Sequence, residues 1–187
     1  EAIIGEETME IREAMITQNF SDGIFKGKGV VTGVKQYSEA KDFYLLPDEH
    51  IPENTVMYEV YSYTGANPST KTGGLNWGLT VMKPVLVNGE CNITRGHFHQ
   101  TLNCDEIYFC FQGEGLLLFM DENGKCWAEK MSTGSVHYID GRLAHRLVNT
   151  GDTELHIGAC WPTDAGHDYE RVQEHPFGVR VFKTDGL

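Results

Sequence analysis

Apolar and polar residues alternate over short stretches through most of the chain, which is the pattern of β-strands with one buried face. The first clear stretch covers residues 56–63, and others follow at 75–82, 84–87, 91–95, 106–111, 115–120, 125–131, 135–139, 144–149 and 153–160. Turn-forming residues separate these stretches, and Asn123-Gly124 between two apolar stretches is a strong hairpin signal. Many short strands at regular spacing predict an all-β sandwich or barrel.

The N-terminal part of the chain has a different pattern. Within residues 6–20, Ile11, Met15 and Ile16 fall near helical spacing behind a run of glutamates, which predicts a helix. Residues 21–34 are glycine-rich and predict a loop with a short strand, and residues 35–43 predict a helical turn. We therefore expect an N-terminal arm over residues 1–54, packed on the barrel or on a partner chain, and a β-barrel domain over residues 55–187.

Composition narrows the choice of partners and of compartment. The 187 residues include 15 Lys+Arg and 27 Asp+Glu, a formal net charge of −12, so nucleic acid and anionic membranes are poor candidates as partners. No apolar run approaches the ~18 residues that a membrane-spanning helix needs. The first residues lack the basic-then-apolar pattern of a signal peptide, and the five cysteines form no CxxC pair. These features predict reduced thiols and a cytoplasmic protein.

Four residues form the candidate site for chemistry: His97, His99, Glu106 and His145. Positions i and i+2 of a strand point to the same face, so His97 and His99 can offer two imidazoles to one ion. Glu106 begins the next predicted strand, and an antiparallel neighbour could bring its carboxylate to the same place. Three imidazoles and one carboxylate suit a divalent transition metal with coordination positions left open for water or substrate.

A histidine pair alone is weak evidence, because histidines on strands are usually packed or solvated. We assign that ordinary role to His50, His137, His156 and His175. The wider pattern is more specific, because it resembles the two motifs of the cupin superfamily. The first motif matches at His97, His99, Glu106 and Gly113, and the second at Gly134, His145 and Asn149. Cys91 replaces the leading glycine of the first motif, while Asp140 and Arg142 replace a proline and a glycine in a turn of the second.

Within the superfamily, the chain resembles the cupin-type glucose-6-phosphate isomerases over about residues 30–180. The resemblance rests on Tyr58–Tyr61, Thr94–His99, Ala144–Asp152 and above all on Asp164-Ala165-Gly166-His167-Asp168-Tyr169. It implies a cupin jelly-roll barrel, and the reversible isomerisation of glucose 6-phosphate and fructose 6-phosphate with a divalent metal.

The resemblance also implies roles for individual residues. The metal ligands would be His97, His99, Glu106 and His145, and the catalytic residues would be Glu106, His145 and Tyr108. Phosphate would contact Thr80, Thr94 and the backbone of Gly96, and the sugar would contact Tyr108, His167 and Tyr169. Trp161 stands where the family uses a tyrosine in the substrate site, and an indole cannot supply that hydroxyl.

Fe²⁺ is the first candidate for the metal, and Mn²⁺, Ni²⁺, Zn²⁺ and Co²⁺ suit the same ligands. The resemblance implies a homodimer. Arg95 and Arg146 could help a protein of charge −12 to hold a sugar phosphate. Two other functions stay open at this point: a non-haem iron dioxygenase, which shares the three-histidine, one-glutamate site, and a non-catalytic sugar-phosphate-binding cupin. The sequence also leaves open whether isomerisation proceeds by proton transfer or by hydride shift.

Overall fold

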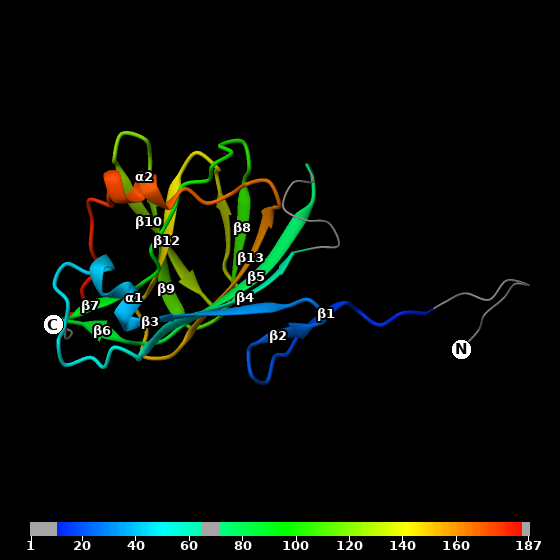
Figure 1. The fold of residues 1–187 in the computed structure, drawn as a ribbon, viewed down its shortest axis with the longest axis horizontal. Coiled ribbons are helices and arrows are strands. Elements are labelled where there is room, and N and C mark those ends of the chain that lie inside the picture. Colours follow the sequence, from blue (N-terminus) through cyan, green and yellow to red (C-terminus); the bar gives the residue numbers. More distant parts are fainter. Residues whose placement is uncertain (1–10, 65–71, 185–187) are drawn as a thin grey trace, which may run out of the picture.

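Two antiparallel β-sheets face each other and close into a barrel in the computed structural model, which describes residues 11–64 and 72–184 (Figure 1). In spatial order, the five-stranded sheet contains β10 (Cys126–Ser132), β9 (Glu114–Met120), β12 (Ala144–Asn149), β7 (Glu90–Ile93) and β6 (Leu86–Val87). The six-stranded sheet contains β11 (Val136–Ile139), β8 (Glu106–Gln112), β13 (Leu155–Pro162), β5 (Leu75–Met82), β4 (Val56–Thr64) and β3 (Val31–Gln36). This confirms the predicted all-β jelly-roll barrel.

The hydrophobic core fills the space between the two sheets, because alternate residues of each strand point inward. In β8, Glu106, Tyr108 and Cys110 are buried, whereas the intervening Ile107 is 44% exposed. Met82, Leu117, Leu147, Ile139 and Ile157 belong to the same buried cluster. The predicted hairpin is also confirmed, since Gly124 has a positive φ of 79° in the turn that joins β9 to β10.

A small hairpin of β1 (Ile16–Gln18) and β2 (Phe25–Gly27) covers part of the outer face of the six-stranded sheet. Phe25 is buried there with Leu79 and Val81. The helix predicted over residues 6–20 is wrong in its described part, because residues 11–15 have no regular structure and Ile16–Gln18 form β1. Ile11 and Met15 are 72% and 60% exposed, so the helical spacing has no buried face to match it. Residues 6–10 lie outside the described residues.

The described helices are short: α1 (Tyr37–Ala40), the 3₁₀ turn η1 (Lys41–Phe43) and α2 (Tyr169–Glu174). The first two confirm the helical turn predicted over residues 35–43. None of the described helices is long and apolar enough to span a membrane. After α2 the chain returns along the five-stranded sheet, where the N–H of Cys91 donates to the carbonyl of Val181 at 2.9 Å. This return places the C-terminal segment beside α1 and η1 (Figure 1).

Candidate active site

Three histidines approach one another at the end of the five-stranded sheet. His97 and His145 form an antiparallel bridge, in which the His97 N–H donates to the His145 carbonyl at 3.3 Å and the His145 N–H returns a bond at 3.1 Å. Directly opposed residues of such a bridge present their side chains on the same face, and His99 shares that face two residues later. The ring centroid of His97 lies 4.5 Å from the ring centroid of His145 and 5.6 Å from that of His99.

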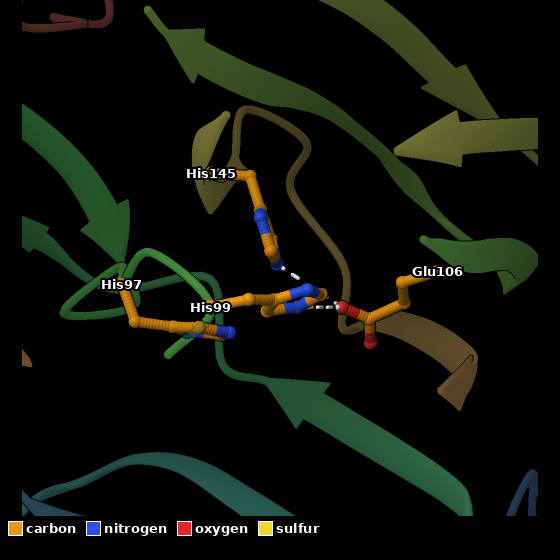
Figure 2. A group of neighbouring side chains, drawn as sticks. All are labelled: His97, His99, Glu106 and His145. Carbon is orange, nitrogen blue, oxygen red and sulfur yellow. Dashed lines mark hydrogen bonds and ion pairs between the residues drawn. The ribbon is translucent and has the colours of Figure 1, made fainter. Parts of the chain in front are cut away.

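Glu106 approaches the histidines from the other sheet, because it is the first residue of β8. Its Oε2 lies 3.1 Å from Nε2 of His99 and 3.2 Å from Nε2 of His145. Figure 2 shows the three rings and the carboxylate converging on one point. The sequence pattern placed Glu106 on a neighbouring antiparallel strand, whereas the structure brings it across the barrel.

This donor set fits a metal ion. One ligand atom from each of the four residues lies within 4.8 Å of all the others, and three of the residues are buried. Nδ1 of His99 faces the carbonyl of Cys104, and Nδ1 of His145 lies 3.4 Å from the carbonyl of Leu143. When Nδ1 carries the proton for those carbonyls, both Nε2 lone pairs point at the Glu106 carboxylate, and a cation between them removes the repulsion. Nε2 of His97 is also buried and makes no hydrogen bond.

The pKa values of two of these groups favour metal binding, which needs neutral imidazoles and an ionised carboxylate. Burial, helped by the neighbouring histidines, holds the pKa of His97 well below its ordinary value. Burial acts to raise the pKa of Glu106, but the imidazoles of His145 and His99 next to its carboxylate outweigh burial and leave that pKa lowered. At neutral pH, His97 is therefore uncharged and Glu106 is ionised.

A cavity of about 280 Å³ opens next to this group, and His97, Glu106 and His145 form part of its wall. The structure brings to this cavity every residue predicted to bind the substrate, namely Thr80, Thr94, Gly96, Tyr108, Trp161, His167 and Tyr169. Arg95 and Arg146 line it too. We name this space the catalytic cavity.

The turn from Thr94 to Gly96 forms one wall of the catalytic cavity. The Thr94 hydroxyl accepts a hydrogen bond from the N–H of Leu147 at 3.0 Å and keeps its own hydrogen available to a ligand. Gly96 has a positive φ of 77°, and a Cβ there would lie 3.0 Å from the Phe177 ring and 3.1 Å from the His145 carbonyl. Only glycine allows this backbone to pass so close to its neighbours.

The block Asp164–Tyr169 braces the histidine segment and supplies the mouth of the cavity. Asp168 and Phe98 form an antiparallel bridge with hydrogen bonds of 2.8 and 3.3 Å, and the Thr101 N–H donates to the Ala165 carbonyl at 2.9 Å. These bonds hold the His167 ring 4.3 Å from that of His97. The Tyr169 side chain lies beyond it, under the guanidinium of Arg95 at 5.2 Å.

Two aromatic residues shape the far wall. The indole of Trp161 packs over Gly78, where a Cβ would lie 2.8 Å from the indole ring. Gly78 therefore makes room for the large side chain of Trp161. Tyr108 is 9% exposed, and burial followed by the charge of Glu106 raises its pKa well above the ordinary value, so its hydroxyl keeps its proton.

Sequence reasoning missed several further lining residues, among them Tyr58, Val60 and Ser62, which alternate along β4. The period-two alternation of this strand was a signal that could have placed them on one face. Burial raises the pKa of Tyr58 to about 12, so this phenol also stays protonated. The histidines assigned ordinary roles lie outside the cavity. Of these, His137 bonds to Glu129 and Ser135, and His156 bonds to Glu154 and the Gly23 carbonyl.

Comparison with known proteins relates this site to one family. The family model described as glucose-6-phosphate isomerase (GPI) matches residues 34–185. The glucose-6-phosphate isomerase of Thermococcus kodakarensis is 36% identical over 165 residues, which cover 84% of this chain and 86% of the relative. The enzyme of the same name from Pyrococcus horikoshii is 34% identical over 174 residues, covering 90% and 88% of the two chains.

Solved structures give more distant likenesses. A complex of oxalate oxidase with glycolate is 16% identical, with a TM-score of 0.46, over 82% of this chain and 59% of that chain. A mutant of Bacillus subtilis oxalate decarboxylase is 21% identical, with a TM-score of 0.47, over 64% and 29%. Likenesses this weak say nothing about activity. The family match and the two relatives decide the assignment, and the chain belongs to the glucose-6-phosphate isomerase family.

Proposed function

We propose that the protein is a metal-dependent aldose–ketose isomerase that interconverts glucose 6-phosphate and fructose 6-phosphate. The observation that carries this proposal is the meeting, in one cavity, of a four-residue metal donor set with the Thr94–Gly96 turn. A cation held by the donor set would attract the two reacting sugar oxygens. The hydroxyl and N–H groups of the turn would bind the phosphate.

His97, His99, Glu106 and His145 would hold one divalent transition ion, with Fe²⁺ as the first candidate and Mn²⁺, Ni²⁺, Zn²⁺ and Co²⁺ as alternatives. When bound, such an ion polarises the sugar carbonyl and offsets the negative charge that develops on oxygen.

The side chains around the ion divide the remaining work. The Glu106 carboxylate is ionised at neutral pH and can take a proton from the carbon next to the carbonyl and return it to the other carbon. A hydride shift between the two carbons is the competing route, in which Glu106 acts only as a ligand. The Tyr108 hydroxyl keeps its proton and can donate to a sugar oxygen, while His145 orients the carboxylate from 3.2 Å.

The phosphate would bind at the other end of the cavity. The hydroxyls of Thr80 and Thr94 and the N–H of Gly96 suit phosphate oxygens. Arg95 and Arg146, which line the same cavity, supply positive charge in a protein whose formal net charge is −12. His167, Tyr169 and Trp161 would enclose the sugar between the two ends.

The test is conversion of fructose 6-phosphate in a dehydrogenase-coupled assay, on protein stripped of metal with a chelator and then supplied with each ion separately. We expect no activity without metal and activity restored by at least one ion. Metal binding without conversion under any ion would contradict the proposal. Oxygen uptake and a sugar-phosphate binding titration on the same samples would then identify a dioxygenase or a non-catalytic binder.

We also propose that the protein is a homodimer in the cytoplasm. β3 is an edge strand with Val31 66% and Val34 46% exposed, and an apolar edge strand needs a cover. All five cysteines are free, as suits a reducing compartment. Sedimentation equilibrium measures the dimer directly, and a monomeric mass would contradict that part of the proposal.

A further inference from the structure

A second cavity lies on the other side of the Thr94–Gly96 turn, between the helical segment α1–η1 and the chain that follows α2. Figure 1 shows these two segments on the same side of the barrel. The cavity has a volume of about 350 Å³, against about 280 Å³ for the catalytic cavity, so a ligand as large as the substrate fits. Arg95, Arg146 and Arg180 line it, and we name it the arginine cleft.

The hydrogen-bonding capacity of these arginines is largely unused. Each guanidinium has five N–H donors. Arg180 uses one nitrogen, which donates to Oε1 of Glu90 at 2.8 Å and to the Phe43 carbonyl at 3.1 Å. Arg146 donates to the Arg95 carbonyl, and its buried Nε has no partner. Within residues 11–64 and 72–184, the Arg95 guanidinium makes no hydrogen bond or ion pair, and it lies 5.2 Å from the centroid of the Tyr169 ring.

The charge of Arg146 is not balanced by a carboxylate in contact with it. Its guanidinium stacks on the buried Phe177 ring at 4.4 Å, and the charges that act on it include the like-charged Arg180 and the Glu90 carboxylate, which is already paired with Arg180. Keeping an unpaired cation away from water beside a second cation is costly, and an anion placed between them offsets that cost. Planar guanidinium groups match the oxygen pairs of phosphate and carboxylate groups.

Two carboxylates, those of Glu39 and Asp42, also line the arginine cleft. Glu39 is bonded to Lys35 at 3.0 Å, whereas Asp42 has no ion pair within the described part of the chain. Carboxylates repel a bare anion but accept hydrogen bonds from hydroxyl groups. A ligand that satisfies both the arginines and the carboxylates therefore carries an acid group together with hydroxyl groups.

We propose that the arginine cleft binds a small polyhydroxylated anion, of the sugar-phosphate or sugar-acid class, at a site separate from the catalytic cavity. Because Arg95 and Arg146 line both spaces, a ligand in the cleft neutralises charge that attracts the substrate phosphate. Its occupancy raises the KM for fructose 6-phosphate to a plateau. A competitor in the catalytic cavity would instead raise the KM without limit.

The first experiment is titration calorimetry on the full, metal-loaded chain with glucose 1-phosphate, gluconate and inorganic phosphate. Glucose 1-phosphate cannot isomerise, because its C1 oxygen is phosphorylated. We expect saturable binding of glucose 1-phosphate or of gluconate, and the tighter of the two identifies the acid group. Equal binding of inorganic phosphate would overturn the assignment of a hydroxyl-bearing ligand. No binding of any probe at millimolar concentration would overturn the site itself.

Two variants locate the binding. Arg180→Gln removes a charge from the cleft, and Gln173→Trp fills the cleft while keeping all three arginines. Each is expected to weaken binding by about tenfold or more. Arg180→Gln breaks an ion pair with the buried Glu90 and can therefore disturb folding. Gln173→Trp changes an exposed residue, so a loss of binding in this variant does not come from misfolding.

The controls are Arg142→Gln, which removes an exposed arginine paired with Asp140 outside the cleft, and Thr94→Ala, which alters the catalytic cavity. Both are expected to bind the probe as the unchanged protein does. Loss of binding in Thr94→Ala with normal binding in Gln173→Trp would place the anion in the catalytic cavity and overturn the inference. Because binding is measured without turnover, this result stands whether or not the protein isomerises fructose 6-phosphate.

Discussion

The two ends of the catalytic cavity are built in different ways. At the metal end, His97, His99, Glu106 and His145 are fixed by contacts among themselves and by bonds to the backbone on both sheets. At the end proposed for the phosphate, Thr80 on β5 and the Thr94–Gly96 turn offer single donors. The metal end therefore acts as a unit, and losing one member affects them all. The phosphate end is a sum of small contributions, and each can be changed alone.

The largest effect is expected from His97→Ala or His145→Ala. Either change removes one of the four donors and leaves the backbone bridge between residues 97 and 145 in place. Turnover should fall by about 10³-fold or more with little loss of folding, since metal polarisation contributes several kcal/mol to the barrier. Metal analysis with circular dichroism checks this. As a control, His137→Ala alters a buried histidine outside the cavity. A similar fall in turnover in that variant would contradict the assignment of the large effect to the metal end.

Glu106→Gln tests whether the carboxylate does more than hold the ion. An amide keeps the size of the side chain but cannot accept a proton from carbon, so turnover should fall by about 10²- to 10⁴-fold even where some metal remains. The readout is turnover divided by metal content. A variant that keeps near-normal turnover per bound metal would remove Glu106 from the role of base and favour the hydride route.

Thr94→Ala probes the phosphate end. One hydrogen bond to a charged oxygen is lost, so the KM for fructose 6-phosphate should rise by about tenfold while turnover changes less. The Thr94 hydroxyl also accepts from the Leu147 N–H, so Thr94→Ser is the matched control that keeps both bonds. An equal fall in turnover and rise in KM would mean that the two ends are not independent.

The smallest effect is expected from Trp161→Tyr. The new hydroxyl is the one that the resemblance to the family implies at this position, and one neutral donor to phosphate should lower the KM by about threefold. Trp161→Phe introduces a ring of the same size as that of tyrosine but without the hydroxyl. It therefore distinguishes the effect of the new hydrogen bond from the effect of the space that opens over Gly78 when the indole is removed. The same KM in both variants would show that the hydroxyl is not used.

Local pattern was enough to predict most of the barrel. The ranges predicted for β5 and β12 agree with the structure, because both strands are mostly buried and turn-forming or proline residues flank each apolar stretch. β3 was harder to see, because Gly33 interrupts it and residues 31–34 are exposed on an edge. The N-terminal helix was predicted from spacing alone, but Ile16 is part of the hairpin strand β1 and packs against the small cluster around Phe25, while Ile11 is exposed.

The site could be predicted as a set of residues but not as an arrangement in space. The motifs gave the donor residues, since each lies in a recognisable local pattern. That Glu106 comes from the opposite sheet depends on how distant strands pair, and local alternation does not contain this information. The arginine cleft exists only because the chain after α2 returns along β7 and brings Phe177 and Arg180 beside Arg146. No periodicity around Arg146 indicates that return.

The position of β13 has a consequence for synthesis of the protein. Of the described strands it is the last to leave the ribosome, yet it lies in the middle of its sheet, with β8 on one side and β5 on the other. Until residues 155–162 emerge, β8 and β5 each present an unpaired edge, and such edges associate with other chains. A slow stretch of translation just before this strand would therefore prolong the most aggregation-prone stage of the nascent chain.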